Sequence, residues 1–362
     1  MAGRIAVLAV VIAAAVTGCA TPPPPPPPPD ADSIVVAIAN STDNRVEVLG
    51  AVSDPAQLAA RPNSSFTDSE ASSIIQAVWG PDDRIYVTDL GNENIRVYEA
   101  DDVLGSADPT PVAILTSGDV QEPYALAFDD DGNLWIADRR NSRQGNLIPN
   151  RITRHSVWAG ATGSVNTPAD VILNFDNTGT FTTSWITDIF VDDQGDLWFS
   201  DTLSWSVSRL SGAGAINVDT FDIVPDLRLQ SVDAGNADLS DIRNPTSFVL
   251  DADGNLYVGN AGRDKVARFD DAVSLAGDYA YDARQADATL AVGLLNTAMV
   301  GLAPDGALWV ASRGPAQFAQ VVRVTGQAGG SGEVALTPTK QFNWSTNTHA
   351  YHEAGGLLFH TR

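Results

Sequence analysis

The sequence predicts an all-β fold made of repeated four-stranded units. The first observation is a motif of two short apolar strands joined by an acidic or glycine-containing turn. Its copies span Ile74–Asp89, Pro123–Asp138, Ile186–Asp201, Pro245–Asn260 and Thr297–Ser312, with a weaker copy at Thr346–Thr361. The second is their spacing, because equivalent leucine or isoleucine positions lie 49 to 63 residues apart. Repeats of about 50 residues with four strands are typical of β-propeller blades.

The turn and the second strand of each copy have clear physical roles. Asp131-Gly132 and Asp253-Gly254 supply the positive-φ turn that joins two antiparallel strands tightly. Leu134–Ala137 is apolar at every position, as expected for a strand covered on both faces by neighbouring blades. One repeated place in this strand is aromatic, which favours packing between blades over a ligand box, and is filled by Tyr86, Trp135, Trp198, Tyr257 and Trp309.

Two further strands follow each pair. Third strands of the form V-x-R or similar are predicted at residues 95–98, 207–210, 266–269 and 321–324. Fourth strands are predicted at residues 112–115, 171–174, 289–292 and 334–336. Longer spacings carry insertions that we expect to be surface loops determining specificity, at Asn141–Asn150, Ala213–Arg243 and Asp271–Ala286.

The two ends of the domain are expected to share one blade. Ser33–Leu49 contains a second and a third strand without a first. The C-terminal segment supplies a first strand, and Gly356–His360 resembles a second strand. Joining the ends removes the open edges of the ring and gives six blades. Counting every segment that resembles a second strand gives seven blades, so both numbers remain open.

The first residues indicate export. Arg4 precedes an apolar run of twelve residues, and Val16-Thr17-Gly18-Cys19 resembles a bacterial lipobox. We therefore expect a signal peptide over residues 1–18, a lipid on Cys19, a tether over 19–32 and a propeller domain over 33–362. Pro22–Pro29 would form a polyproline II spacer. The predicted location is extracytoplasmic and membrane-anchored, facing the periplasm or the cell surface; an ordinary secretory signal is the alternative.

Composition excludes one class of partner. The chain has 21 Lys+Arg against 45 Asp+Glu, a net charge of −24. Nucleic-acid binding needs a cationic surface, so we expect no nucleic-acid partner. The hydrophobic content of 44% is enough for a sizeable core.

The motif DGNLWIAD at Asp131–Asp138, followed by a V-x-R strand, resembles NHL repeats and the gluconolactonase/regucalcin-like six-bladed propellers. More distantly it is similar to the virginiamycin B lyases. The resemblance covers residues 33–360 and implies a propeller that serves either as an enzyme or as a binding scaffold. In the regucalcin-like enzymes, Glu, Asn and Asp at the starts of the innermost strands hold a divalent metal in the central channel.

This chain departs from that metal-binding pattern. The matching places hold Tyr124, Thr187, Thr246 and Ala298, none of which is a carboxylate. Two places earlier stand Glu122, Trp185, Asn244 and Asn296. The best available metal-binding set is therefore Glu122, Asp188 and Asn244. Their positions relative to the turn glycine differ from those of the metal ligands in the regucalcin-like family. The alternative is that these polar side chains line a wet channel.

The sequence carries two weaker chemical signals. The acidic turn Asp129–Gly132 partly mimics a calcium loop, so weak Ca²⁺ binding is possible there, although no cofactor is expected. His352-Glu353 is a conceivable acid–base pair, and His349 lies near the predicted channel; the lyase resemblance implies a histidine base. Strand alternation points His349 and His352 to opposite sides, which favours a structural or solvated role.

The function predicted from the sequence is a non-catalytic scaffold that binds a protein or a glycan at the cell envelope. The alternative is a metal-dependent hydrolase, lactonase or lyase that acts at the central channel. A binding face is expected near the tryptophans that lie outside the repeat, which are Trp158, Trp185, Trp205 and Trp344.

Overall fold

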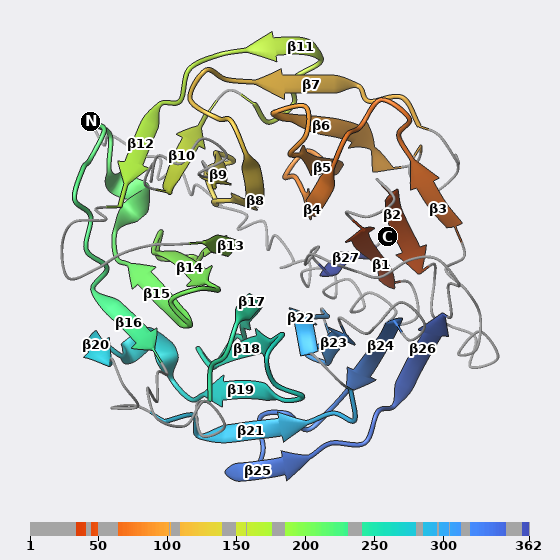
Figure 1. Ribbon diagram of the computed structural model, residues 1–362, viewed down its shortest axis with the longest axis vertical. Coiled ribbons are helices and arrows are strands. Elements are labelled where there is room, and N and C mark those ends of the chain that lie inside the picture. The colour runs from red at the N-terminus through yellow and green to blue at the C-terminus, as the bar shows by residue number, and fades with distance from the viewer. Residues whose placement is uncertain are drawn as a thin grey trace, which may run out of the picture.

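The computed structural model describes residues 34–40, 45–49, 64–100, 102, 109–139, 150–156, 158–175, 185–230, 241–279, 285–294, 297–303, 305–312, 319–344 and 357–361. Their strands form six sheets of four or five strands, arranged around a common centre (Figure 1). The fold is an all-β propeller, as the repeats predict. Each sheet is named below after its innermost strand.

Five sheets follow the predicted order of four antiparallel strands. The first strands are β4 (Ile74–Trp79), β8 (Pro123–Phe128), β13 (Ile186–Val191), β17 (Pro245–Leu250) and β22 (Thr297–Leu302). The second strands are β5 (Arg84–Asp89), β9 (Leu134–Asp138), β14 (Leu197–Asp201), β18 (Leu256–Asn260) and β23 (Leu308–Ser312). The third strands are β6 (Asn94–Glu99), β10 (Arg151–His155), β15 (Ser206–Leu210), β19 (Val266–Phe269) and β24 (Ala319–Val324). The fourth strands are β7 (Ala113–Thr116), β12 (Val171–Asn174), β16 (Leu227–Gln230), β21 (Ala288–Ala291) and β26 (Lys340–Trp344).

The sixth sheet joins the two ends of the domain. Its order is β27 (Leu357–Thr361), β1 (Ile34–Asn40), β2 (Arg45–Leu49) and β3 (Ser64–Thr67). β27 runs antiparallel to β1 and lies innermost, between β4 and β22 (Figure 1). The interpretation of Gly356–His360 as a second strand is therefore wrong, because this segment takes the first place in the composite sheet.

Three sheets carry a fifth, parallel strand at the outer edge. This strand comes from the connection between the third and fourth strands of the next sheet: β11 (Gly163–Asn166) pairs with β7, β20 (Gly277–Tyr279) with β16, and β25 (Gly332–Ala335) with β21. Thr220, in the connection between β15 and β16, likewise forms a single parallel bridge to Leu173 of β12, the fourth strand of the preceding sheet. The prediction of a fourth strand at 334–336 is wrong, because these residues lie in or beside β25. Thr220, in the insertion at 213–243, and β20, in the insertion at 271–286, thus pair with sheet edges that would otherwise remain open.

The arginine of the V-x-R motif holds these connections. Arg154 donates to the carbonyl of Gly214 at 2.8 Å, in the short helix η3 (Ala213–Ala215) of the next sheet's connection. Arg209 donates to the carbonyls of Val273, in η4 (Ala272–Ser274), and Leu275 at 2.9 Å. Arg268, 2% exposed, donates to Gln327 and Gly330 carbonyls, both at 2.7 Å. In these three sheets the motif arginine is thus a tie to the next sheet, whereas Arg323 bonds Asp305 and Thr339.

The predicted packing role of the repeated aromatics is confirmed. Tyr86, Trp135, Trp198, Tyr257 and Trp309 are all at most 1% exposed. Trp135 donates its indole N–H to Asp129 at 2.8 Å, and Trp198 donates to Asp192 at the same distance. The aspartate that opens each of these turns therefore satisfies a buried ring, which explains the acidic turns in structural terms.

Candidate functional site

The first strands begin, and the second strands end, on one face of the ring, which we call the mouth face. The side chain that ends each second strand accepts hydrogen bonds from the chain entering the first strand. Asp89 accepts from the amides of Ser72 and Ser73, both at 3.0 Å, and Asp138 accepts from the Glu122 amide at 2.8 Å. Likewise, Asp201 accepts from the amide of Trp185, and Asn260 accepts from the amide of Arg243. The residue at the end of each of these second strands thus satisfies backbone amides at the mouth face.

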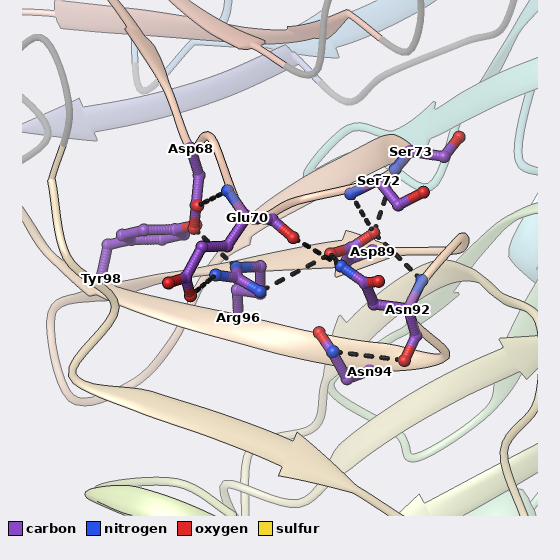
Figure 2. Close-up of polar contacts among 9 residues, drawn as sticks. All are labelled: Asp68, Glu70, Ser72, Ser73, Asp89, Asn92, Asn94, Arg96 and Tyr98. Atoms are coloured by element: carbon purple, nitrogen blue, oxygen red, sulfur yellow. Dashed lines mark hydrogen bonds and ion pairs between the residues drawn. The ribbon is translucent and has the colours of Figure 1, made fainter.

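The β4 sheet carries the most elaborate version of this arrangement (Figure 2). Arg96, 3% exposed, donates its Nε–H to Asp68 at 2.6 Å, and its guanidinium lies 3.7 Å from Asp89. The hydroxyl of Tyr98 donates to the same Asp68 oxygen at 2.6 Å. Asn92 joins Asp89 to the carbonyl of Glu70, with both bonds at 2.7 Å.

The charge state of this cluster follows from its bonds. Burial disfavours the Asp68 carboxylate, but bonds from Tyr98, the Glu70 amide and Arg96 outweigh it and lower the pKa of Asp68. Burial and the Asp68 carboxylate raise the pKa of Tyr98 above its usual range. The cluster is an ionised, internally bonded unit that fixes the connection into β4. No local pattern in the sequence marks Asp68, Arg96 and Tyr98 as a set.

Polar side chains at the third place of the inner strands meet in the centre. Gln76 of β4 donates its Nε2–H to Asp188 of β13 at 2.8 Å and accepts from the amide of Leu126 on β8 at 2.5 Å. β8 lies between β4 and β13, so this pair reaches past one sheet (Figure 1). Asp188 also accepts from the amides of Ile189 and Phe248, at 3.0 and 3.2 Å.

This network uses the free inner edge of each sheet. Gln76, Asp188 and Ser247 each accept a backbone amide from the next inner strand, Ser247 from Val300 at 3.3 Å. Burial raises the pKa of Asp188 to about 6, against the hydrogen bonds that favour its charged form. The centre of the ring at this level is occupied by bonded side chains.

The other predicted channel residues divide into two groups. Thr187 and Thr246 are buried and donate to the carbonyls of Pro245 and Ala298 on the next inner strand. Tyr124 is 2% exposed, whereas Glu122 and Asn244 are half-buried on the mouth face. Among the residues described, no three His, Cys, Asp or Glu side chains are placed to hold a metal ion. Asn296, His349, His352, Glu353 and Cys19 lie outside the described residues.

Two tryptophans outside the repeat lie on the mouth face beside arginines. The guanidinium carbon of Arg139 is 3.2 Å from the ring centroid of Trp185 and 5.2 Å from that of Tyr124. The guanidinium of Arg243 is 5.7 Å from the ring of Trp205. The sequence predicted a binding face near Trp185 and Trp205, and it did not predict the arginines that lie beside them.

The other two tryptophans outside the repeat are Trp158 and Trp344, and the structure does not place either of them beside an arginine on the mouth face among the residues described. Trp158 is fully buried, stacks on His155 at 3.9 Å between centroids and donates to Thr167 at 2.7 Å. Its expected place on a binding face is therefore wrong. Burial lowers the pKa of His155 to about 4, so this ring is neutral near pH 7. The side chain of Trp344 lies outside the described residues.

Within the described ranges, no helix has the length and hydropathy to cross a membrane. No protein-family model and no curated protein matches the sequence.

Solved structures do share the fold. A protein of unknown function from Bacteroides caccae matches with a TM-score of 0.57 at 10% identity, over 91% of this chain and all of its own. A nidogen–laminin complex matches with a TM-score of 0.53 at 15% identity, over 90% and 98% of the two chains. A streptogramin B lyase matches with a TM-score of 0.48 at 13% identity, over 91% and 88%. At these identities the first two matches show one thing, that the chain is similar to known β-propellers in fold.

Proposed function

We propose that this protein is a lipid-anchored, extracytoplasmic propeller of six blades, one for each sheet, and that it acts as a non-catalytic binding scaffold at the cell envelope. Support for the anchor is the lipobox-like Val16–Cys19 followed by eight prolines. Support for six blades is the set of six sheets, closed by the pairing of β27 with β1. The repeat motif supports membership of the NHL and gluconolactonase/regucalcin-like group.

The observation that carries the binding role is the pair of Trp–Arg contacts on the mouth face. Trp, Tyr and Arg are the residues most enriched in the energetic centres of protein interfaces. The same face offers Leu203, whose side chain is 57% exposed. A rigid ring presents such residues with little loss of conformational freedom on association. We favour a protein over a glycan, because one face of the Trp185 indole is covered by the Arg139 guanidinium and so is not open for stacking on a sugar.

Site-specific photo-crosslinking in the producing cells tests this proposal. A photoreactive residue at Leu203 samples the mouth face, and one at Asp193 samples the opposite face, where the β13–β14 turn lies. We expect discrete adducts from position 203 that mass spectrometry identifies as one protein, and few from position 193. Equal labelling from both positions, or adducts with polysaccharide alone, would contradict a protein-binding mouth face.

One observation favours the alternative, a metal-dependent hydrolase, lactonase or lyase at the channel. Asp188 is a buried carboxyl with a raised pKa, a feature that active sites share with structural networks. Calcium calorimetry on the domain from Ser33, with Glu122→Ala and Asn244→Ala as variants, separates the two functions. A site lost in both variants supports the enzyme and leads to lactone substrates; no binding heat supports the scaffold.

A further inference from the structure

The outer rim of the ring carries exposed apolar side chains beside β12, the outermost strand of the β8 sheet (Figure 1). They belong to the connection between β15 and β16, where Val218, Phe221 and Val224 are 70%, 69% and 64% exposed. These are the three most exposed large apolar side chains among the residues that the structure describes. We call Val218, Phe221 and Val224, together with Asp219 and Asp222 between them, the rim strip.

Hydrogen bonds hold the rim strip against the sheet. The amide of Thr220 donates to the carbonyl of Ile172 at 3.0 Å, and its carbonyl accepts the amide of Asn174 at 2.9 Å. The side chain of Asp219 accepts the amide of Ile172 at 2.9 Å. The amide of Ile223 donates to the carbonyl of Asn174 at 3.3 Å. The three apolar side chains therefore cannot turn inward unless several of these bonds break.

The core of the fold does not account for the exposed side chains. Ile216 and Ile223 of the same connection pack into the apolar cluster between the β8 and β13 sheets. In three other connections the apolar side chain of the edge strand also packs onto a core cluster, namely Val165 of β11, Tyr279 of β20 and Val334 of β25. The exposed side chains of the rim strip are an addition to this pattern.

The polar side chains of the rim strip are acidic. Asp219 and Asp222 are exposed, and the Asp222 carboxylate forms no hydrogen bond or ion pair with any residue described. Two arginines on strands of the adjacent sheets are already engaged. Arg154 is buried and donates to two oxygens of the same connection, and Arg228 forms an ion pair with Asp278. The rim strip thus combines apolar surface with negative charge that these arginines do not neutralise.

These two properties together define a partner. Exposed apolar patches mark interaction sites, and complementary charge selects what binds there. A second copy of this chain is disfavoured as the occupant, because it carries the same carboxylates and a net charge of −24. We propose that the rim strip binds a protein segment in which Lys or Arg alternates with large apolar side chains. The rim strip contains none of the mouth-face residues, so this inference goes beyond the scaffold function proposed above.

Fluorescence anisotropy of labelled peptides tests the proposal on the whole protein in detergent, with detergent micelles alone as the blank. The measurements are made in about 0.3 M NaCl, which screens non-specific attraction of cations to the acidic chain. The probe is a 12-residue peptide that alternates Lys with Leu or Phe. One control peptide has Glu in place of Lys, and the other has Ser in place of Leu and Phe. We expect the probe to bind at least tenfold more tightly than either control.

Variants of the rim strip locate the site. Phe221→Ser should weaken binding of the probe at least tenfold, and Asp222→Asn about threefold. Val273→Ser and Asp130→Asn are the matched controls, because both residues are exposed and lie outside the rim strip. Both controls should bind the probe as the wild type does. All four variants should keep the wild-type melting temperature, since each replaced side chain is exposed, and a loss of binding is then not a loss of folding.

Equal binding of the three peptides, or unchanged binding in Phe221→Ser, would overturn the proposal. Self-association of the wild type that Phe221→Ser abolishes would also overturn it, because a second copy would then be the occupant. Photo-crosslinking from position 203 samples the mouth face and not the rim strip. The scaffold function and this inference can therefore fail separately, and the two experiments distinguish which has failed.

Discussion

Gln76 and Asp188 are 112 residues apart in the chain, yet Nε2 of Gln76 lies 2.8 Å from Oδ1 of Asp188 at the centre of the ring. The two residues belong to sheets separated by a third, whose Leu126 amide also bonds Gln76. A single buried contact therefore links the inner strands of three sheets. The carboxyl group of Asp188 has a raised pKa, so the contribution of this contact to folding stability depends on pH.

Asp188 is expected to stabilise the protein more at low pH than at neutral pH. Its pKa is about 6 in the folded state and near 3.8 when unfolded. The folded state therefore binds the extra proton, and this stability is complete below about pH 4 and lost as the pH rises through 6. The free energy of unfolding of the wild type, relative to Asp188→Asn, should increase by on the order of 2–3 kcal/mol between pH 7 and pH 4. Denaturant titrations at pH 4 and pH 7 measure this increase, and a difference that is equal at the two pH values would contradict it.

His155 is expected to have the opposite effect over nearly the same range. Burial lowers its pKa from 6.5 to about 4. The unfolded chain binds the extra proton, so the stability that the neutral ring provides is present above pH 6.5 and lost as the pH falls toward 4. Relative to His155→Phe, which keeps an aromatic ring against Trp158, the wild type should lose about 3 kcal/mol over this interval. A difference that does not change with pH would show that the pKa of His155 is the same in the folded and the unfolded chain.

Arg268 should be among the most important single side chains for stability. It is buried and donates to three carbonyls of the β24–β26 connection, those of Gln327, Gly329 and Gly330. Arg268→Ala removes a buried side chain and leaves the buried Gln327 carbonyl and the two glycine carbonyls without their donor, and we expect a loss of about 2–4 kcal/mol in the free energy of unfolding. Lys265→Ala is the control, because its ion pair with Glu333 joins the same two sheets at an exposed site and should contribute under about 1 kcal/mol.

The anchor can be tested directly. Wild-type cells fed an alkyne fatty acid should label the protein, and Cys19→Ser should abolish the label and release the protein from the membrane fraction. Deleting Pro22–Pro29 should leave labelling intact, because the tether is a spacer. Unlabelled wild-type protein recovered in the soluble fraction would favour an ordinary secretory signal.

The sequence predicts the local elements well and the contacts between them poorly. The bounds of β8, β9, β13, β14, β17 and β18 coincide with the motif copies, because apolar alternation and turn residues are local signals. Residues 334–336 were predicted to be a fourth strand but lie in or beside β25, because a parallel edge strand and a fourth strand have the same short apolar pattern. Trp185 and Trp205 could be identified as candidate binding residues because they lie outside the repeat. Arg139 and Arg243 carry no such signal, because each meets its ring only after the chain has folded.

The same limit applies to the centre of the ring. Asp188 stood out in the sequence as a channel carboxylate, but nothing local indicates that a glutamine 112 residues away would bond it. The arginines of the predicted third strands were identified as part of the repeat, whereas the role of Arg268 as a tie depends on carbonyls some 60 residues further along. Arg154 lies in β10, a third strand that was not predicted.

The composite sheet makes the order of synthesis matter. β1 is made before any other strand described, yet its inner partner β27 is made after all of them. Until Leu357–Thr361 has been released, β1 presents an unpaired edge at the centre of an open arc. A chain without Leu357–Thr361 would therefore present an exposed strand edge, which is a template for aggregation. The pairing of β27 with β1 thus makes closure of the composite sheet depend on the strand that is synthesised last among those described.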